Sequence, residues 1–98
     1  MPPKYIGGSS FTTDFMTNFS FKYEQDEMRQ YSFVVQYVID TRGNLLGARI
    51  AGKKEKEQTR VEREIIKTLY RLQNWEPAQH NGKKVNALIT TRLNIGFR

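Results

Sequence analysis

Side chains that could do chemistry are few in this chain, and they are not grouped. The 98 residues include one histidine, His80, and no cysteine. His80 stands beside Asn81-Gly82 in a polar stretch, which is typical of an exposed loop rather than of a general base. A closed zinc site takes about four ligands, usually cysteine and histidine, so the sequence favours neither a metal site nor a cofactor. We therefore expect a protein that is not an enzyme.

The charged residues are many, but their pattern is that of a surface. Sixteen lysines and arginines against ten carboxylates give a formal net charge of +6, which favours anionic partners without choosing among them. The carboxylates are interleaved with cations, and no glycine-rich phosphate motif occurs. A basic row could grip phosphates, although a solvated helix side explains the same spacing. The row comprises Arg60, Arg63, Lys67 and Arg71.

Three segments with alternating apolar residues predict the β-strands that must position any site. The segment 31–40 is apolar on one side and partly apolar on the other, which suits a central strand. A type I turn at 40–43, closed by Gly43, returns the chain into a second strand at 45–51. The segment 84–97 alternates more cleanly, so we expect a half-solvated strand nearer an edge.

Two segments have helical periodicity. Phe11, Phe15 and Phe19 recur at intervals of four, which predicts a short helix over 10–19 with Ser9 or Ser10 as its N-cap. Thr59-Arg60-Val61-Glu62 has the form of a capping box and opens a helix over 59–72. Between the first helix and the first strand, 24–30 is polar, and we expect it to be irregular.

These elements predict an α+β fold. The hairpin, the helix and the third strand close most simply as a three-stranded antiparallel sheet in the order second, first, third strand. Two helices then pack on one face of the sheet. We expect residues 1–9 to be a flexible lead-in or linker stub and residues 10–98 to form a single domain. No apolar run approaches the length of about 20 residues that a membrane-spanning helix needs.

The segment 72–85 is the most distinctive part of the chain. It contains the only tryptophan, Trp75, which we expect to be a buried anchor, followed by Pro77, which stops helix propagation. Asn81-Gly82 then supplies a turn, so His80 and Gly82 should lie in an exposed loop. The pattern Trp-x-Pro-Ala, a few residues, Gly, two residues and Val resembles the TonB C-terminal domain family.

Three further segments resemble this family in the expected order. They are the opening 3–8 (Pro-x-aromatic-x-Gly-Gly), the valine-rich hairpin 33–44 and the closing strand 93–97. The resemblance covers most of residues 3–97. It implies a periplasmic domain that captures an extended TonB-box-like peptide of an outer-membrane receptor as an added strand, for energy transduction in transport. The family's Tyr-Pro-x-x-Ala segment before the first strand is not reproduced at 21–24.

An edge strand suits this kind of capture because its outward N–H and C=O groups are unpaired. We therefore expect the peptide-binding edge to comprise Asn86, Ala87, Leu88, Ile89, Thr90 and Thr91. By the same reasoning the chain is a monomer or a strand-exchanged dimer. The membrane would be reached only through an anchor outside this chain.

Two alternatives stay open. In the first, the chain is a basic nucleic-acid-binding α+β domain, because 29–36 partly resembles the RNP1 pattern of an RNA-recognition motif. Exposed rings at Tyr31, Phe33 and Tyr37 would favour it, but we expect these rings in the core and expect no nucleic-acid partner. In the second, a TonB-like interaction domain is detached from another membrane protein and has no transport role.

Overall fold

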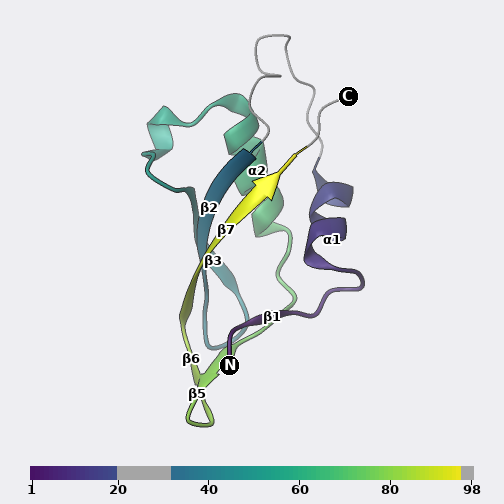
Figure 1. Cartoon of the computed structure of the whole chain (residues 1–98), viewed down its shortest axis with the longest axis vertical. Coiled ribbons are helices and arrows are strands. Elements are labelled where there is room, and N and C mark those ends of the chain that lie inside the picture. Colours follow the sequence, from purple (N-terminus) through teal and green to yellow (C-terminus); the bar gives the residue numbers. More distant parts are fainter. Residues whose placement is uncertain (20–31, 96–98) are drawn as a thin grey trace.

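The computed structural model describes residues 1–19 and 32–95, and the statements below refer to these ranges. They form an α+β fold with an antiparallel sheet of three strands, β2 (Ser32–Ile39), β3 (Leu45–Ile50) and β7 (Ala87–Asn94). The strands lie in the order β3, β2, β7, so β3 and β7 are the two edges (Figure 1). The predicted α+β class, with two helices and a three-stranded antiparallel sheet, is confirmed.

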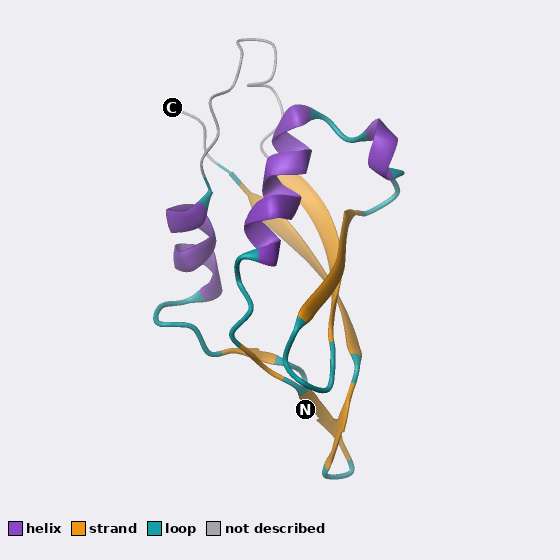
Figure 2. Ribbon diagram, turned by 180° about the vertical axis from the view of Figure 1, so that it is seen from behind, coloured by secondary structure: helices purple, strands orange, loops and turns teal. Residues whose placement is uncertain are grey.

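One face of the sheet carries the core. The odd-numbered residues of β2 are buried on this face, as the alternation in the sequence predicts. Helix α2 (Arg60–Tyr70) packs mainly against β3, and α1 (Phe11–Asn18) lies beside α2 (Figure 2). Both helices contribute buried side chains to the same core, namely Phe15 from α1 and Val61, Ile65 and Leu69 from α2. Among the described elements, no helix covers the opposite face, which we call the open face.

Side-chain caps define where both helices begin. In α1 the hydroxyl of Ser10 accepts a hydrogen bond from the backbone N–H of Thr13 at 3.2 Å, which makes Ser10 the N-cap. In α2 the predicted capping box is present. The Thr59 N–H donates to Glu62 Oε1 at 2.9 Å, and the Glu62 N–H donates to Thr59 Oγ1 at 3.2 Å. These bonds satisfy donors that the first helical turn would otherwise leave unpaired.

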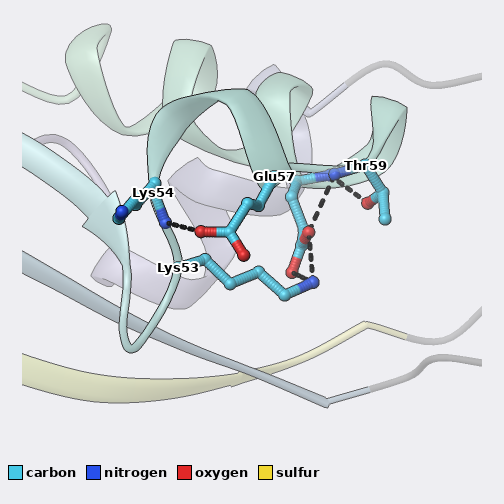
Figure 3. Close-up of polar contacts among 5 residues, drawn as sticks. Lys53, Lys54, Glu57 and Thr59 are labelled. Atoms are coloured by element: carbon cyan, nitrogen blue, oxygen red, sulfur yellow. Dashed lines mark hydrogen bonds and ion pairs between the residues drawn. The ribbon is translucent and has the colours of Figure 1, made fainter.

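The connection from β3 to α2 is held by a buried carboxylate. Glu62 is fully buried, and its two carboxylate oxygens lie 2.9 and 3.0 Å from Lys53 Nζ. Between them runs the short 3₁₀ helix η2 (Glu55–Glu57), where the Lys54 N–H donates to Glu57 Oε1 at 3.1 Å (Figure 3). Burial of a carboxylate is tolerated when charged and polar donors bond to it, and here Lys53 Nζ and the Thr59 N–H do so.

The turn between β2 and β3 follows the prediction. Asp40 Oδ1 accepts from the N–H groups of Arg42 and Asn44, each at 2.9 Å, and Gly43 has φ +81°. A Cβ at position 43 would also collide with the backbone oxygen of Trp75. Glycine is therefore required here for its positive φ and for a close approach between two segments.

The lower part of the molecule differs from the prediction in three places. The strand expected over 84–97 is interrupted at Asn86, because Lys83–Val85 forms a separate strand, β6, that pairs with β5 (Ala78–His80). The segment expected as a loop after Pro77 is thus a hairpin. Its turn, Asn81-Gly82, has φ values of +51° and +77°, as a tight hairpin turn requires.

The third difference concerns the lead-in. Residues 1–9 include a short strand, β1 (Lys4–Tyr5), which pairs antiparallel with β4 (Trp75–Glu76). The Ile6 N–H donates to the Asn74 carbonyl at 2.8 Å, and Tyr5 packs against the core. The expected irregular segment 24–30, the departure at 21–24, and the ends of the predicted strands at Tyr31 and Phe97 lie outside the described residues. No described helix has the length and apolar character needed to cross a membrane.

Candidate functional site

The expected peptide-binding residues lie mostly on one strand. Residues 87–91 belong to β7, whereas Asn86 lies in the break between β6 and β7. The Asn86 side chain accepts a hydrogen bond from the Thr41 N–H at 3.1 Å, which ties the break to the β2–β3 turn. The available edge is therefore 87–94, displaced toward the C-terminus from the expected one.

The register of the sheet fixes which backbone groups of β7 point away from β2. The N–H groups of Ala51 and Asp40 bond to the carbonyls of Val34 and Asn44, so even-numbered residues of β2 direct their backbone toward β3. Successive residues of a strand direct these groups to opposite sides, so odd-numbered residues bond to β7. Their partners in β7 are also odd-numbered. The outward groups are consequently those of Leu88, Thr90, Arg92 and Asn94.

The opposite edge of the sheet, on β3, is closed by the side chain of Gln73. Its amide oxygen accepts from the Leu45 N–H at 2.8 Å, and its amide nitrogen lies 3.3 Å from the Leu45 carbonyl oxygen. Gln73 thus occupies the donor and the acceptor that a neighbouring strand would use at Leu45. The amide is held in place because its nitrogen also donates to the Tyr70 carbonyl at 2.9 Å.

Two more contacts and an irregularity close the remainder of β3. The Ala48 N–H donates to the Tyr70 hydroxyl at 3.0 Å, and the Ile50 carbonyl accepts from the Lys53 N–H at 3.2 Å. The register shifts opposite Tyr37, which places a bulge at residues 47–48 of β3. Bulges and occupied backbone groups are the usual means by which edge strands resist pairing. In the described structure β7 has no such cover, and β2 is the only strand beside it.

The side chains of β7 differ between its two faces. Ala87, Ile89 and Thr91 are half-buried and point toward the helices, and Ile89 packs against the core. Leu88, Thr90 and Arg92 are exposed on the open face. A strand added beside β7 would therefore contact Ile89 on the helix side of the sheet. On the open face it would contact an apolar, a polar and a charged side chain, namely Leu88, Thr90 and Arg92.

The open face carries an apolar row beside a polar row. Leu46, Val38 and Leu88 stand directly opposite one another across the three strands, and Leu88 is 63% exposed. In the next row the Gln36 side chain bonds to its neighbours on both sides. Its nitrogen donates to Thr90 Oγ1 at 3.2 Å, and its oxygen accepts from Arg49 Nε at 3.0 Å.

Trp75 lies at the end of the core and is half-buried, so it is less enclosed than the buried anchor that the sequence predicts. Its ring lies 5.3, 5.6 and 5.8 Å from the rings of Tyr5, Phe11 and Tyr37, and its Nε1 donates to the Leu72 carbonyl at 2.8 Å. The ring remains partly exposed because β4 lies at the rim, beyond the three-stranded sheet. His80 and Gly82 are exposed, as predicted, but His80 belongs to strand β5 and not to a loop.

Two tyrosines of this aromatic cluster have perturbed acidity. Burial raises the pKa of Tyr37 to about 12. Burial also raises the pKa of Tyr5 to about 12, assisted by the hydrogen bond from its hydroxyl to Asp14. Both shifts favour the neutral phenol, which is the form that an apolar core tolerates. Tyr37 is buried and Tyr5 packs against the core, so we assign both tyrosines to the core.

The basic side of α2 is partly occupied by contacts within the chain. Arg71 donates to the Asn18 carbonyl at 3.1 Å, and Lys67 lies 3.8 Å from the carboxylate of Glu64. Phe33 and Tyr37 are each 2% exposed, so neither ring is available for stacking on bases, and Tyr31 lies outside the described residues. The exposed rings that would favour an RNA-recognition motif are therefore missing at both of the positions that the structure describes.

Cavities and titratable clusters add little to this site. A hollow of about 460 Å³ lies where η2 meets the closed edge of β3, and its rim mixes cations with Glu55 and Tyr70. Within residues 1–19 and 32–95, no three histidine or carboxylate side chains come close enough together to hold a metal ion. Sequence reasoning missed the closure of β3, because Gln73 is 28 positions from its partner Leu45.

A comparison of the chain with protein-family models, curated proteins and solved structures finds no significant match. One edge, β3, is closed by side chains, and the other, β7, presents its backbone outward.

Proposed function

We propose that this domain captures an extended peptide as an added strand on the outer edge of β7. The peptide is a TonB-box-like segment of an outer-membrane receptor, and the domain is a periplasmic, TonB C-terminal-like module that serves energy transduction in transport. The resemblance of the four sequence segments supports the partner. The order β3, β2, β7, with the third predicted strand at an edge, supports the mode of binding.

The observation that carries this proposal is the difference between the two edges. The outward groups of β3 are occupied by Gln73, Tyr70 and the Lys53 backbone. On β7 the outward groups of residues 88–94 are directed away from β2, and no described strand pairs with them. An unpaired row of backbone donors and acceptors is the template that strand addition uses.

The expected affinity follows from the number of bonds that this edge offers. A short peptide would add about four to six backbone hydrogen bonds, each with a net worth of about 0.5–1.5 kcal/mol. Ordering the peptide and the edge side chains subtracts several kcal/mol, so the dissociation constant should be micromolar or weaker. Because backbone bonds dominate, binding should depend less on salt than phosphate binding does.

The direct test is an amide chemical-shift titration of the full chain. With TonB-box-like peptides, we expect the largest shifts in residues 87–94 and small shifts in β3. A nucleic-acid oligomer, titrated separately, should leave β7 unchanged. If only the oligomer changes the amide chemical shifts, and the changes lie at Arg60, Arg63 and Lys67 on the basic side of α2, the chain is a nucleic-acid-binding domain and the proposal is wrong.

A pair of substitutions isolates the backbone contribution. Thr90→Pro removes one N–H of β7 that points away from β2. Because this N–H makes no hydrogen bond to β2, the three-stranded sheet should be retained. Thr90→Ala removes the same side chain and keeps the N–H. We expect the proline variant to weaken peptide binding by about tenfold, in line with the loss of about one hydrogen bond, and the alanine variant to bind nearly as well as the parent. Equal affinities for all three proteins would contradict capture through the backbone.

A further inference from the structure

The hollow of about 460 Å³ lies beside the closed edge of the sheet, which is the edge opposite β7. Its apolar wall consists of Ala48 and Ile66, which are half-buried and pack against the core. Glu55 is the only carboxylate among the described residues that line it, so cations are in excess there. The polar lining comprises Arg49, Lys53, Lys54, Glu55, Gln58 and Tyr70.

Two groups of this lining are held in place and still have hydrogen-bond donors to offer. Arg49 Nε donates to the Gln36 side chain at 3.0 Å, and the two terminal nitrogens of the guanidinium have no partner within residues 1–19 and 32–95. The Tyr70 hydroxyl accepts from the Ala48 N–H at 3.0 Å, and no described group accepts the proton of this hydroxyl. Donors that are already positioned lose little conformational freedom when they bind a ligand.

The two lysines of the hollow differ in how far their charge is already balanced. Lys53 Nζ bonds to both carboxylate oxygens of Glu62. The backbone N–H of Lys54 donates to Glu57, whereas the Lys54 side chain points away from that carboxylate (Figure 3). Neither Lys54 nor Arg49 forms an ion pair with a carboxylate of the described residues. Lys54 and Arg49 are therefore the cations that a ligand can use.

A neighbouring hollow adds to the positive potential. It has a volume of about 550 Å³, shares Lys54 and Glu55 with the first hollow, and is also lined by Lys56 and Arg63, both exposed. Charges at such distances attract an anion over about 8–10 Å at ordinary salt concentrations. The region around η2 therefore favours a ligand with negative charge.

We propose that the hollow beside β3 binds a phosphate monoester. The phosphate lies between Arg49, Lys54 and the Tyr70 hydroxyl. The organic group of the ester lies against Ala48 and Ile66. A guanidinium can give two parallel bonds to phosphate, and the ammonium and the hydroxyl bring the total to about four donors, which suits three terminal phosphate oxygens better than the two oxygens of a carboxylate. This site is independent of the peptide capture at β7.

A ligand in this hollow also braces the closed edge. Tyr70 covers the Ala48 N–H of β3, so a phosphate that bonds to the Tyr70 hydroxyl holds this cover in place. Where the cover opens only after the ligand has left, a ligand at ten times its dissociation constant slows amide hydrogen exchange at Ala48 about tenfold. Loose attraction to the charged surface leaves this exchange rate unchanged.

The binding test is an amide chemical-shift titration of the full chain with inorganic phosphate and with phenyl phosphate. We expect saturable shifts at residues 48–49, 53–55, 58 and 70, with a dissociation constant of about 1 mM for inorganic phosphate. Phenyl phosphate should bind about threefold to tenfold more tightly, because its ring leaves water beside Ile66. Equal affinities would overturn the place assigned to the organic group. No saturable shift up to about 50 mM phosphate would overturn the site itself.

Substitutions separate a built site from attraction by net charge. Arg49→Gln and Lys54→Gln should each weaken phosphate binding about fivefold or more, and should reduce the slowing of exchange at Ala48. The fold should be retained, because both side chains are exposed and the glutamine at position 54 keeps the backbone N–H that bonds to Glu57. Lys84→Gln, in β6, is the matched control with the same loss of charge and should change the affinity less than about twofold. An equal effect of Lys84→Gln and Arg49→Gln would mean that no defined site exists.

A phosphate monoester can belong to a soluble molecule or to a lipid headgroup, and vesicles distinguish the two sources. The vesicles are phosphatidylcholine with phosphatidic acid, which carries a phosphate monoester, or with phosphatidylglycerol, which carries a diester. Sedimentation with the phosphatidic acid vesicles alone, lost in Arg49→Gln, would assign the site to a headgroup. Saturable binding of free phosphate without sedimentation would assign it to a soluble ester. If sedimentation and titration both fail, the proposal is wrong.

Discussion

At the scale of single residues, Trp75 shows how a small domain closes the end of its core. The indole packs among Tyr5, Phe11 and Tyr37, and its N–H is satisfied by the Leu72 carbonyl. Its ring is nonetheless half-buried, so it contributes less than a fully enclosed aromatic side chain would.

We expect Trp75→Ala to lower the free energy of unfolding by about 2–4 kcal/mol, somewhat below the loss of about 3–5 kcal/mol that is typical of a fully buried aromatic residue. Trp75→Phe, which retains a ring, should cost less. Urea unfolding followed by circular dichroism measures both. A loss below about 1 kcal/mol for the alanine variant would mean that the indole is a surface residue, and would make it a candidate for ligand contact.

Tyr37 gives a prediction about alkaline pH. Its pKa is about 12 in the folded chain against an ordinary value of 10.0, so the neutral phenol stabilises the fold fully below about pH 10. This stabilisation is lost as the pH rises toward 12. Relative to Tyr37→Phe, the parent should lose about 1.4 kcal/mol between about pH 8 and about pH 11. Urea unfolding of both proteins at the two pH values measures the change, and an unchanged difference would show that Tyr37 ionises normally.

At the scale of elements, the closed edge of β3 depends on two side chains from the end of α2 and the residues after it. Gln73→Ala removes both hydrogen bonds to Leu45, and we expect a loss of about 1–2 kcal/mol in the free energy of unfolding. Amide hydrogen exchange should become faster at Leu45 and stay unchanged in β7.

The matched control for this substitution is Gln79→Ala. The Gln79 backbone pairs with Met1, but its side chain makes no hydrogen bond that the structure records in the described residues. Gln79→Ala should therefore leave the amide hydrogen-exchange rate at Leu45 unchanged. If Gln73→Ala also leaves this rate unchanged, the β3 edge is protected by something other than the glutamine.

The sequence predicted the long elements well and the short ones poorly, for a physical reason. The alternation over 31–40 and the capping box at Thr59 are local patterns with many residues in agreement, and both elements are present. Strands β1, β4, β5 and β6 have two or three residues each, too few for a period to be recognised. The break at Asn86 arises because the two halves of the predicted strand pair with different strands, β6 with β5 and β7 with β2. No local sequence pattern encodes this difference in pairing.

The candidate site could be predicted only in part. The edge position of the third strand follows from its cleaner alternation, which names residues 87–91 correctly as members of one strand. The contrast between the edges could not be predicted, because it depends on Gln73 and Tyr70 meeting β3 in three dimensions. Contacts over such separations are set by the packing of α2 and not by the residues nearby.

At the scale of the whole molecule, one open edge permits self-association. Two copies can pair through their β7 strands about a twofold axis, which is the commonest symmetry of homo-oligomers. We expect sedimentation equilibrium to show monomers and, at high concentration, dimers. A TonB-box-like peptide should compete with the dimer, and Thr90→Pro should remain monomeric. Trimers or larger species would contradict pairing through a single edge.

The closure of β3 gives the sheet a valence of one. A unit with two reactive ends polymerises, whereas a unit with one can only be joined once and then stops. A second copy that pairs through its own β7 brings a closed β3 edge with it, so the joined sheet offers no backbone template for a further strand. By occupying outward backbone groups of β3, Gln73 and Tyr70 limit strand addition to one edge of the sheet. The domain can therefore expose the edge of β7 without assembling into a fibril.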